Sequence, residues 1–222
     1  MDVSASDFAE ARERMVDGQI RPNRLSDPRV LQAMREIARE RFLPPRLAPF
    51  AYIDDHVALG NGRVLMEPLA FARLAQLAQI RSGVRTLVVG AGTGYGAAVL
   101  AACGAAVTAL EQDAALLDIA RPALATCGPL VALVAGTLAS GWPAGAPWDL
   151  VFIEGAVPGV PAALGEQLRP DSGRLVGVLA GGGRPGNAIL GERTAAGLTI
   201  RPMFDCATPV LPQLVPKSEF VF

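Results

Sequence analysis

The stretch T-L-V-V-G-A-G-T-G-Y-G-A, residues 86–97, decides the fold of this 222-residue chain. A short apolar run ends in three alternating glycines, Gly90, Gly92 and Gly94, and an alanine-rich segment follows. This pattern is typical of a buried parallel strand, a tight turn and a helix N-terminus, which is where open α/β sheets bind nucleotide cofactors. Because glycine has no Cβ, its backbone accepts positive φ and a ligand can approach it closely.

Two classes of cofactor bind at such a turn. Dinucleotides place a pyrophosphate on the helix N-terminus and need G-x-G-x-x-G/A, whereas S-adenosylmethionine (SAM), which carries no phosphate, is bound by a looser G-x-G-x-G. Counted from Gly90, the sixth residue is Tyr95, which breaks the dinucleotide pattern. Counted from Gly92, the residues match the dinucleotide pattern. That match starts two residues too late, however, because the strand is predicted to end at Val89. A tight turn without a ligand is the alternative.

A carboxylate supports the binding of an adenosine group. Residues 106–110 are predicted to form the second strand, and Glu111 closes it, about 20 residues past the glycines as the nucleotide-binding fingerprint requires. A carboxylate there accepts both ribose hydroxyls of an adenosine. The pair of glycine turn and strand-end acid fits both SAM and NAD, so it indicates an adenosine ligand rather than a reaction.

Composition excludes several classes of function. The formal net charge of −1 gives no bulk attraction to nucleic acid or to an anionic membrane. Apolar stretches are broken before about 18 residues, so no transmembrane helix is predicted. Residues 1–10 are acidic and lack the apolar core of a signal peptide, which favours the cytoplasm. Three cysteines without a C-x-x-C indicate reduced thiols, and the single histidine, His56, excludes a multi-histidine metal site; no metal is predicted.

The order of elements indicates an α/β fold. Helices are expected over residues 5–17, from Pro28 to the prolines 44–45, and from Pro68 to about residue 80. Alternating strands and helices follow, with strands near 86–89, 106–110, 130–134, 149–153 and 173–179. Residues 198–222 are expected to form a strand pair joined through the proline-rich stretch 209–216. We expect two parts, an N-terminal helical extension with an acceptor-side segment (1–80) and a compact SAM-binding core (81–222).

Three stretches of the chain resemble one family. They are R-M-V-D-G-Q-I (14–20) with D-P-R-V-L-Q-A-M-R-E-I-A-R-E-R-F-L-P (27–44), the turn G-A-G-T-G-Y (90–95), and A-P-W-D-L-V-F-I-E-G-A-V-P-G-V-P (146–161). Through these stretches, which are spread along its length, the chain resembles the protein-L-isoaspartate O-methyltransferase family. The resemblance implies a Rossmann-like SAM-dependent methyltransferase sheet with helices on both faces. It also implies SAM as cofactor, a protein or peptide substrate, and methylation of isoaspartyl carboxylates in protein repair.

The resemblance also implies which residues form the site, and the position of Glu154 in the sequence adds one further candidate residue. Glu154 ends the fourth strand, where ligands lie in such sheets. The predicted cofactor residues are Gly90, Ala91, Gly92, Thr93, Gly94, Tyr95, Glu111, Gln112, Thr137, Leu138 and Glu154. The predicted acceptor pocket consists of Leu65, Met66, Glu67 and Pro68.

The sequence departs from the family at three polar positions. The family has a serine at the methyl-transfer site, where this chain has Met66. It has an acidic residue two positions before the first glycine, here Val88, and Gly-Asp-Gly after the third strand, where this chain has Thr137 and Leu138 as the second and third residues. In the family the acidic residue lies near the methionine part of SAM and the aspartate contacts the adenine, so the differences affect both the acceptor and the cofactor side. No catalytic residue is assigned, because the serine that would recognise the acceptor is replaced.

Neighbouring charges offer partial replacements for the lost polar groups. Arg63 lies just before the altered segment and either holds the acceptor or is a solvated arginine beside the 60–62 turn. Glu154 is a hypothetical partner for the cationic sulfonium of SAM. Three functions stay open: isoaspartyl repair with an altered pocket, O-methylation of another acceptor, and a non-catalytic relative that binds SAM or a partner or has lost SAM. The intact turn and Glu111 favour a working cofactor site, and the sequence fixes no oligomeric state.

Overall fold

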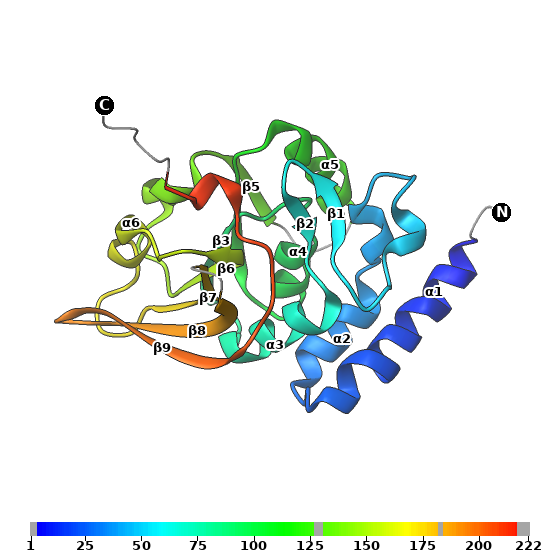
Figure 1. Cartoon of the computed structure of the whole chain (residues 1–222), viewed down its shortest axis with the longest axis horizontal. Coiled ribbons are helices and arrows are strands. Elements are labelled where there is room, and N and C mark those ends of the chain that lie inside the picture. Colours follow the sequence, from blue (N-terminus) through cyan, green and yellow to red (C-terminus); the bar gives the residue numbers. More distant parts are fainter. Residues whose placement is uncertain (1–3, 127–130, 182–183, 217–222) are drawn as a thin grey trace.

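The N-terminal part of the chain is helical in the computed structural model, which describes residues 4–126, 131–181 and 184–216. Helix α1 (Ala5–Arg14) is capped by Ser4 and continues as a π-helical segment, Met15–Ile20. Helix α2 (Pro28–Glu36) begins at Asp27, whose carboxylate accepts the Arg29 N–H. Both starts agree with the sequence-based prediction, because local capping chemistry sets them. Helix α1 lies along the outside of α2 (Figure 1).

A small hairpin leads from these helices to the main sheet. Strands β1 (Val57–Gly60) and β2 (Arg63–Leu65) pair antiparallel, and helix α3 (Pro68–Ala78) follows with proline in its first turn. The start of α3 at Pro68 agrees with the prediction. None of the described helices is long and apolar enough to cross a membrane.

The main sheet has seven strands in the order β5-β4-β3-β6-β7-β8-β9. The first five are parallel and match the five predicted strands to within a few residues, although residue 130 of the predicted third strand lies outside the described residues. Strand order reverses between β3 and β6, and ligands of open α/β sheets bind at such a switch point. The strands are β3 (Arg85–Val89), β4 (Ala106–Glu111), β5 (Val131–Ala135), β6 (Leu150–Val157), β7 (Arg174–Gly181), β8 (Arg184–Thr194) and β9 (Gly197–Asp205).

The antiparallel edge of the sheet differs from the prediction. It is a hairpin of β8, which was not predicted, and β9, which contains the start of the predicted strand pair; the hairpin is closed at Gly197, and the part of that pair after residue 216 falls outside what the structure describes. Proline lacks the N–H that a sheet ladder needs, so the segment after β9 runs back toward the β1–β2 hairpin (red in Figure 1). Among the described residues it meets the sheet where the Cys206 N–H donates to the Gly186 carbonyl of β8, and again at β6, where Val210 forms a bridge with Ala156. Residues 217–222 lie outside the described chain.

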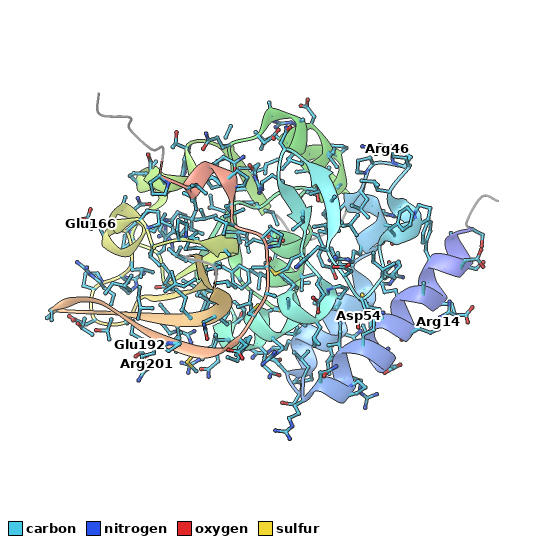
Figure 2. All side chains as sticks on the ribbon, in the orientation of Figure 1. Arg14, Arg46, Asp54, Glu166, Glu192 and Arg201 are labelled. Carbon is cyan, nitrogen blue, oxygen red and sulfur yellow. The ribbon has the colours of Figure 1, made fainter. Side chains whose placement is uncertain are left out.

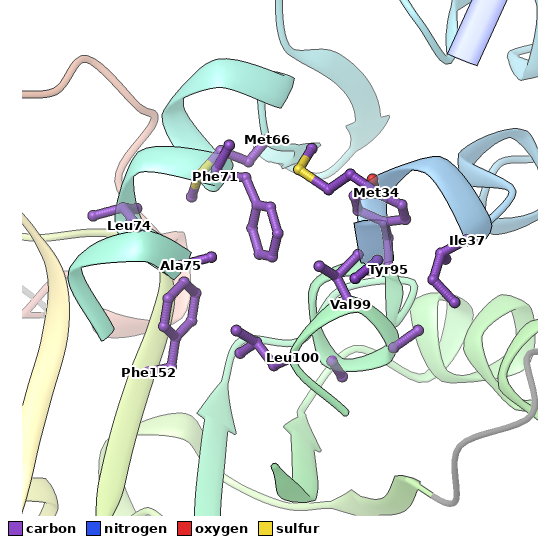
Figure 3. Packing of buried hydrophobic residues seen from close by; sticks show 14 of the residues in the cluster. Met34, Ile37, Met66, Phe71, Leu74, Ala75, Tyr95, Val99, Leu100 and Phe152 are labelled. Atoms are coloured by element: carbon purple, nitrogen blue, oxygen red, sulfur yellow. The ribbon is translucent and has the colours of Figure 1, made fainter. Parts of the chain in front are cut away.

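Alternating side chains divide the core between the two faces of the sheet. Val88 and Phe152 face a large cluster that includes α2, α3, α4 (Tyr95–Ala102) and α5 (Ala114–Ala125). Leu87 and Ile153 face a second cluster, covered by the short helix α6 (Ala162–Glu166) and by single turns. Figure 3 shows α3 and α4 meeting in the first cluster through Phe71, Tyr95 and Leu100. Because the glycine turn directly precedes α4, this packing fixes where the turn lies.

Candidate cofactor and acceptor site

The glycine turn has the backbone conformation that the sequence predicted. Gly90, Gly92 and Gly94 have φ angles of 74°, 58° and 94°. All three angles lie in the left-handed region that residues with a Cβ rarely adopt. The turn follows β3 at the switch point and leads directly into α4, with Gly94 as the N-cap. Residues 90–95 are nevertheless buried by the protein itself, so other parts of the chain cover the turn.

Glu111 is fully buried at the end of β4 and surrounded by donors. Its Oε2 accepts the Gly92 N–H at 2.7 Å, and its Oε1 accepts the N–H groups of Gln112 and Asp113 at 2.7 and 2.9 Å. Arg63 then donates from Nη1 to Oε1 and from Nη2 to Oε2, both at 2.8 Å. This is a bidentate ion pair whose side chains are 2% and 0% exposed. The carboxylate predicted to hold a ribose therefore holds an arginine.

Arg63 also contacts the turn, so the expectation of a solvated arginine is wrong. Its Nη2 donates to the Gly90 carbonyl at 3.0 Å, and a Cβ built on Gly92 would lie 3.9 Å from the same nitrogen. The side chain reaches from β2 across the mouth of the turn. No periodicity or motif around residue 63 indicates this contact, because the partner lies on a strand that is distant in sequence.

A second cover comes from residues 209–214, which we call the C-terminal strap. The Leu211 N–H donates to the Ala156 carbonyl at 2.8 Å, which fixes the strap at the end of β6. A Cβ on Gly90 would lie 2.9 Å from Leu211 Cδ1, and one on Gly155 would lie 2.7 Å from Leu211 Cγ. Real Cβ atoms do not approach this closely, so Leu211 fills the space above both glycines. Pro212 packs against Gly62, the residue before Arg63, in the same way.

Glu154 lies on β6 close to the N-terminus of α4. A Cβ on Gly96 would lie 2.6 Å from Glu154 Cδ, so only glycine leaves room for this carboxylate. Its Oε2 is buried and has no hydrogen-bond partner among the described residues. Burial raises the pKa of Glu154 to about 8, although Arg63 and Arg39 favour the charged form. A neutral acid and a carboxylate therefore interconvert here near physiological pH.

The stability of the protein should report this raised pKa. Glu154 has a higher pKa in the folded chain, about 8, than its ordinary 4.5, so the folded state holds the proton more tightly. Stability is therefore lost as pH rises from about 4.5 to 8. Each pKa unit corresponds to about 1.4 kcal/mol. Glu154→Gln imitates the protonated acid, and we expect it to be more stable than the parent at pH 8.5 by a few kcal/mol, with a smaller gain at pH 5.5.

Urea unfolding at the two pH values measures this difference directly. Glu166→Gln is the matched control, because that carboxylate is exposed on α6 (Figure 2) and its substitution should change little at either pH. A gain for Glu154→Gln that is the same at both pH values would contradict a raised pKa at this site.

The predicted adenine side is formed by the loop after β5. The Leu138 N–H donates to the Gln112 side-chain oxygen at 3.2 Å, which ties this loop to the end of β4. Leu138 is fully buried in the second core cluster, whereas Thr137 is exposed. Leu138 therefore presents an apolar wall rather than a polar contact at this edge.

The acceptor segment is held by backbone contacts. The Met66 side chain is 2% exposed and packs in the first core cluster near Phe71 (Figure 3). Glu67 is half-buried at the start of α3, and its N–H donates to His56 Nδ1 at 2.8 Å. Burial raises the pKa of the Glu67 carboxyl above its usual value. Leu65 and Pro68 are buried on either side, so Glu67 supplies the only ionisable side chain of residues 65–68.

Arg39 joins the acceptor segment to the cofactor turn. It is fully buried, its Nε donates to the Ala51 carbonyl at 2.7 Å, and its Nη2 donates to the Met66 carbonyl at 2.5 Å. Its guanidinium lies 4.7 Å from the centre of the Tyr95 ring. Burial lowers the pKa of Arg39 and raises the pKa of Tyr95 to about 12. The predicted helix from Pro28 toward Pro44 ends at Glu36, and Arg39 lies on a separate turn (Arg39–Phe42) that directs it inward.

A SAM molecule fits part of this arrangement. The turn has the required backbone, and the buried Thr93 Oγ1 and Glu154 Oε2 have no hydrogen-bond partners among the described residues. Buried polar groups without partners are costly, and a polar ligand would satisfy them. The outer face of Glu111 and the space above Gly90 are instead taken by Arg63 and Leu211. These two side chains must move before an adenosine can reach Glu111.

Comparison with known proteins settles the family. The model of the family described as Protein-L-isoaspartate(D-aspartate) O-methyltransferase (PCMT) matches residues 10–182. The chain belongs to the protein-L-isoaspartate O-methyltransferase family. A relative of that name from Methylorubrum extorquens is 44% identical over 170 residues, which is 77% of this chain and 74% of the relative. Another from Methanoregula boonei is 38% identical over 83% of this chain and 85% of the relative. The resemblance found in the sequence is confirmed.

Solved structures confirm the α/β Rossmann-like fold. A protein-L-isoaspartate O-methyltransferase superposes with a TM-score of 0.78 at 24% identity, covering 91% of this chain and 67% of the other. A putative protein of the same family from Plasmodium falciparum, in complex with S-adenosyl-L-homocysteine, gives 0.73 at 16% identity, covering 91% and 98%. The family match ends at residue 182, so β8, β9 and the strap lie beyond it.

Proposed function

We propose that this chain is a SAM-dependent O-methyltransferase that methylates the carboxylate of isoaspartyl residues in proteins. Membership of the protein-L-isoaspartate O-methyltransferase family supports the reaction class. The observation that carries the cofactor assignment is the Glu111 carboxylate bonded to the Gly92 N–H within an intact glycine turn. Free buried thiols at Cys103 and Cys206 support the cytoplasm as compartment, because reduced cysteines persist there.

The proposed cofactor site follows the elements that meet at the switch point. The turn, Gly90 to Tyr95, would hold the methionine part of SAM, and Glu111 would accept the ribose hydroxyls. Gln112, Thr137 and Leu138 would border the adenine. Glu154 would face the sulfonium, which favours its ionised form because opposite charges attract. When bound, SAM supplies an electrophilic methyl group.

The chain itself has a simple chemical task. A carboxylate acceptor has an ordinary pKa near 4 and is already ionised at neutral pH, so no general base is required. Orientation of that carboxylate toward the methyl group is then the main contribution of the protein. Residues 65–68 would form the wall that orients it, with their backbone held by Arg39. Packing of Met66 and Leu138 would keep water away.

Met66 favours a second candidate function, O-methylation of a different acceptor. The position at which the family has a serine here has a buried thioether, which donates no hydrogen bond. An acceptor bound through apolar contacts would suit this wall better than a charged isoaspartyl group. The second candidate keeps the same cofactor site and differs only in the substrate.

A paired measurement tests the proposed function. The purified chain is titrated calorimetrically with S-adenosylhomocysteine, and methyl transfer from labelled SAM is followed to an isoaspartyl peptide and to the same peptide with normal aspartate. We expect binding, and transfer to the isoaspartyl peptide alone. Binding without transfer to either peptide would support the second candidate. No binding by the parent, nor by variants in which alanine replaces Arg63 or Leu211, the two side chains that cover the site, would contradict both.

A further inference from the structure

Arg63 occupies the place of the ribose. A ribose diol would donate two hydrogen bonds to the two oxygens of Glu111, and Arg63 already donates to both at 2.8 Å. The carboxylate also accepts the N–H groups of Gly92, Gln112 and Asp113. Five donors on two oxygens leave no free lone pair on the outer face for a sixth and seventh. Arginine and ribose therefore compete for the same atoms.

We propose that Arg63 and Leu211 form a latch that holds the cofactor site closed, and that SAM binds only to a conformation in which both have moved. The proposal rests on the proposed function, since it concerns access to that cofactor site. Arg63 blocks the carboxylate, while Leu211 fills the space over Gly90 and Gly155. The two parts are contiguous, because Pro212 packs on Gly62 beside Arg63.

Buried polar atoms without hydrogen-bond partners distinguish a site that is closed reversibly from one that the protein core has filled permanently. The buried Thr93 Oγ1 and Glu154 Oε2 have no hydrogen-bond partner among the described residues, whereas the Tyr95 hydroxyl interacts with the Arg39 side chain. A core that had replaced its ligand by repacking would be expected to satisfy or remove such groups. They remain, and they lie on the turn and on β6, the elements that the ligand would contact.

The strap is suited to movement. Its described attachments are backbone bonds at Pro209 and Leu211 to Ala156, together with the packing of Leu211, Pro212 and Leu214. The strap also lies beyond residue 182, where the match to the family model ends, whereas Arg63 lies within the matched residues. Movement of the strap would uncover Gly90 and give Arg63 a path to solvent.

A closed resting state lowers the apparent affinity for the cofactor. The observed dissociation constant equals the intrinsic one divided by the fraction of molecules in the open conformation. If the open form amounts to about a tenth of the molecules or less, removing the latch tightens binding by about tenfold or more. The gain should occur for either part of the latch, because each blocks a different portion of the same ligand.

Calorimetric titration with S-adenosylhomocysteine tests the latch without any activity measurement. Arg63→Ala removes the competitor and leaves Glu111 with its three backbone donors, and we expect at least tenfold tighter binding than in the parent chain. Leu211→Ala tests the strap independently if Arg63→Ala does not fold, and it should tighten binding as well. Arg201→Ala is the matched control, because it removes an arginine from an exposed ion pair with Glu192 (Figure 2) and should leave the affinity unchanged.

Hydrogen exchange supplies a structural measurement. In the parent chain, S-adenosylhomocysteine should speed exchange of the Leu211 N–H, which the closed strap protects through Ala156. Equal or weaker binding by Arg63→Ala and Leu211→Ala, with the parent still binding, would overturn the latch and leave the proposed function intact. No binding by the parent or by either variant would overturn the cofactor site and the latch together.

Discussion

Glu111→Gln should lower the free energy of unfolding by about 3–5 kcal/mol, because it leaves the buried Arg63 without its counter-charge. The Arg63 side chain is 2% exposed and its guanidinium meets both carboxylate oxygens. A glutamine there keeps the shape but turns an amide toward the arginine, and one of the backbone donors loses its acceptor. The same variant should lose affinity for S-adenosylhomocysteine, since the ribose loses its charged partner.

A double variant separates the two parts of this effect. Arg63→Met with Glu111→Gln removes the uncompensated charge while leaving an amide oxygen for the backbone N–H groups. It should recover much of the stability, but its affinity should stay below that of Arg63→Ala, because the ribose still lacks its carboxylate. Glu192→Gln is the matched control, because its pair with Arg201 is exposed and such pairs contribute about 0–1 kcal/mol. Chemical unfolding of all four proteins provides the comparison. A Glu111→Gln variant as stable as the control variant would mean that Arg63 leaves the pair freely.

The contrast between Glu111 and Arg63 explains what the sequence could predict about the site. The glycines, the strand-end acid and the capped helices are local patterns, and the structure confirms the conformations they predicted. The Arg63 contact with Glu111 joins residues 48 positions apart, and a local pattern carries no information about such a pair. Leu211 reaches the turn from farther still. Its position depends on the path of a proline-rich segment that forms no regular element along most of its length.

The antiparallel edge illustrates a different failure of prediction. Strand β8 has the sequence R-P-G-N-A-I-L-G-E-R-T, in which glycine, proline and charged residues obscure the alternation expected of a strand. It forms because β7 and β9 supply hydrogen-bond partners on both sides. Tertiary pairing therefore overrides weak local preference here. In contrast, the parallel strands β3 and β6 contain the continuous buried apolar runs Leu87–Val89 and Leu150–Ile153.

The second large effect is expected at Phe71, which connects the two halves of the site. Phe71 lies on α3, one turn after the acceptor segment, and is 1% exposed. The centroid of its ring lies 5.8 Å from the centroid of the Tyr95 ring in the cofactor turn and 5.9 Å from that of the Phe152 ring in β6 (Figure 3). Phe71→Ala should therefore lower the free energy of unfolding by about 3–5 kcal/mol, the usual range for such a cavity.

Its functional consequence follows from the same contacts. Tyr95 is held between Phe42, Phe71 and the Arg39 guanidinium, so removal of one ring loosens the residue that ends the turn. We expect weaker binding of S-adenosylhomocysteine together with the loss of stability, whereas Phe71→Leu, which refills most of the cavity, should restore the larger part of both. Phe50→Ala is the control, because that ring is 51% exposed. Thermal unfolding and calorimetric titration of the three variants measure both effects. If Phe71→Ala were destabilised but bound S-adenosylhomocysteine as tightly as the parent, Tyr95 would keep its position without Phe71. Packing in the core would then be independent of the shape of the turn.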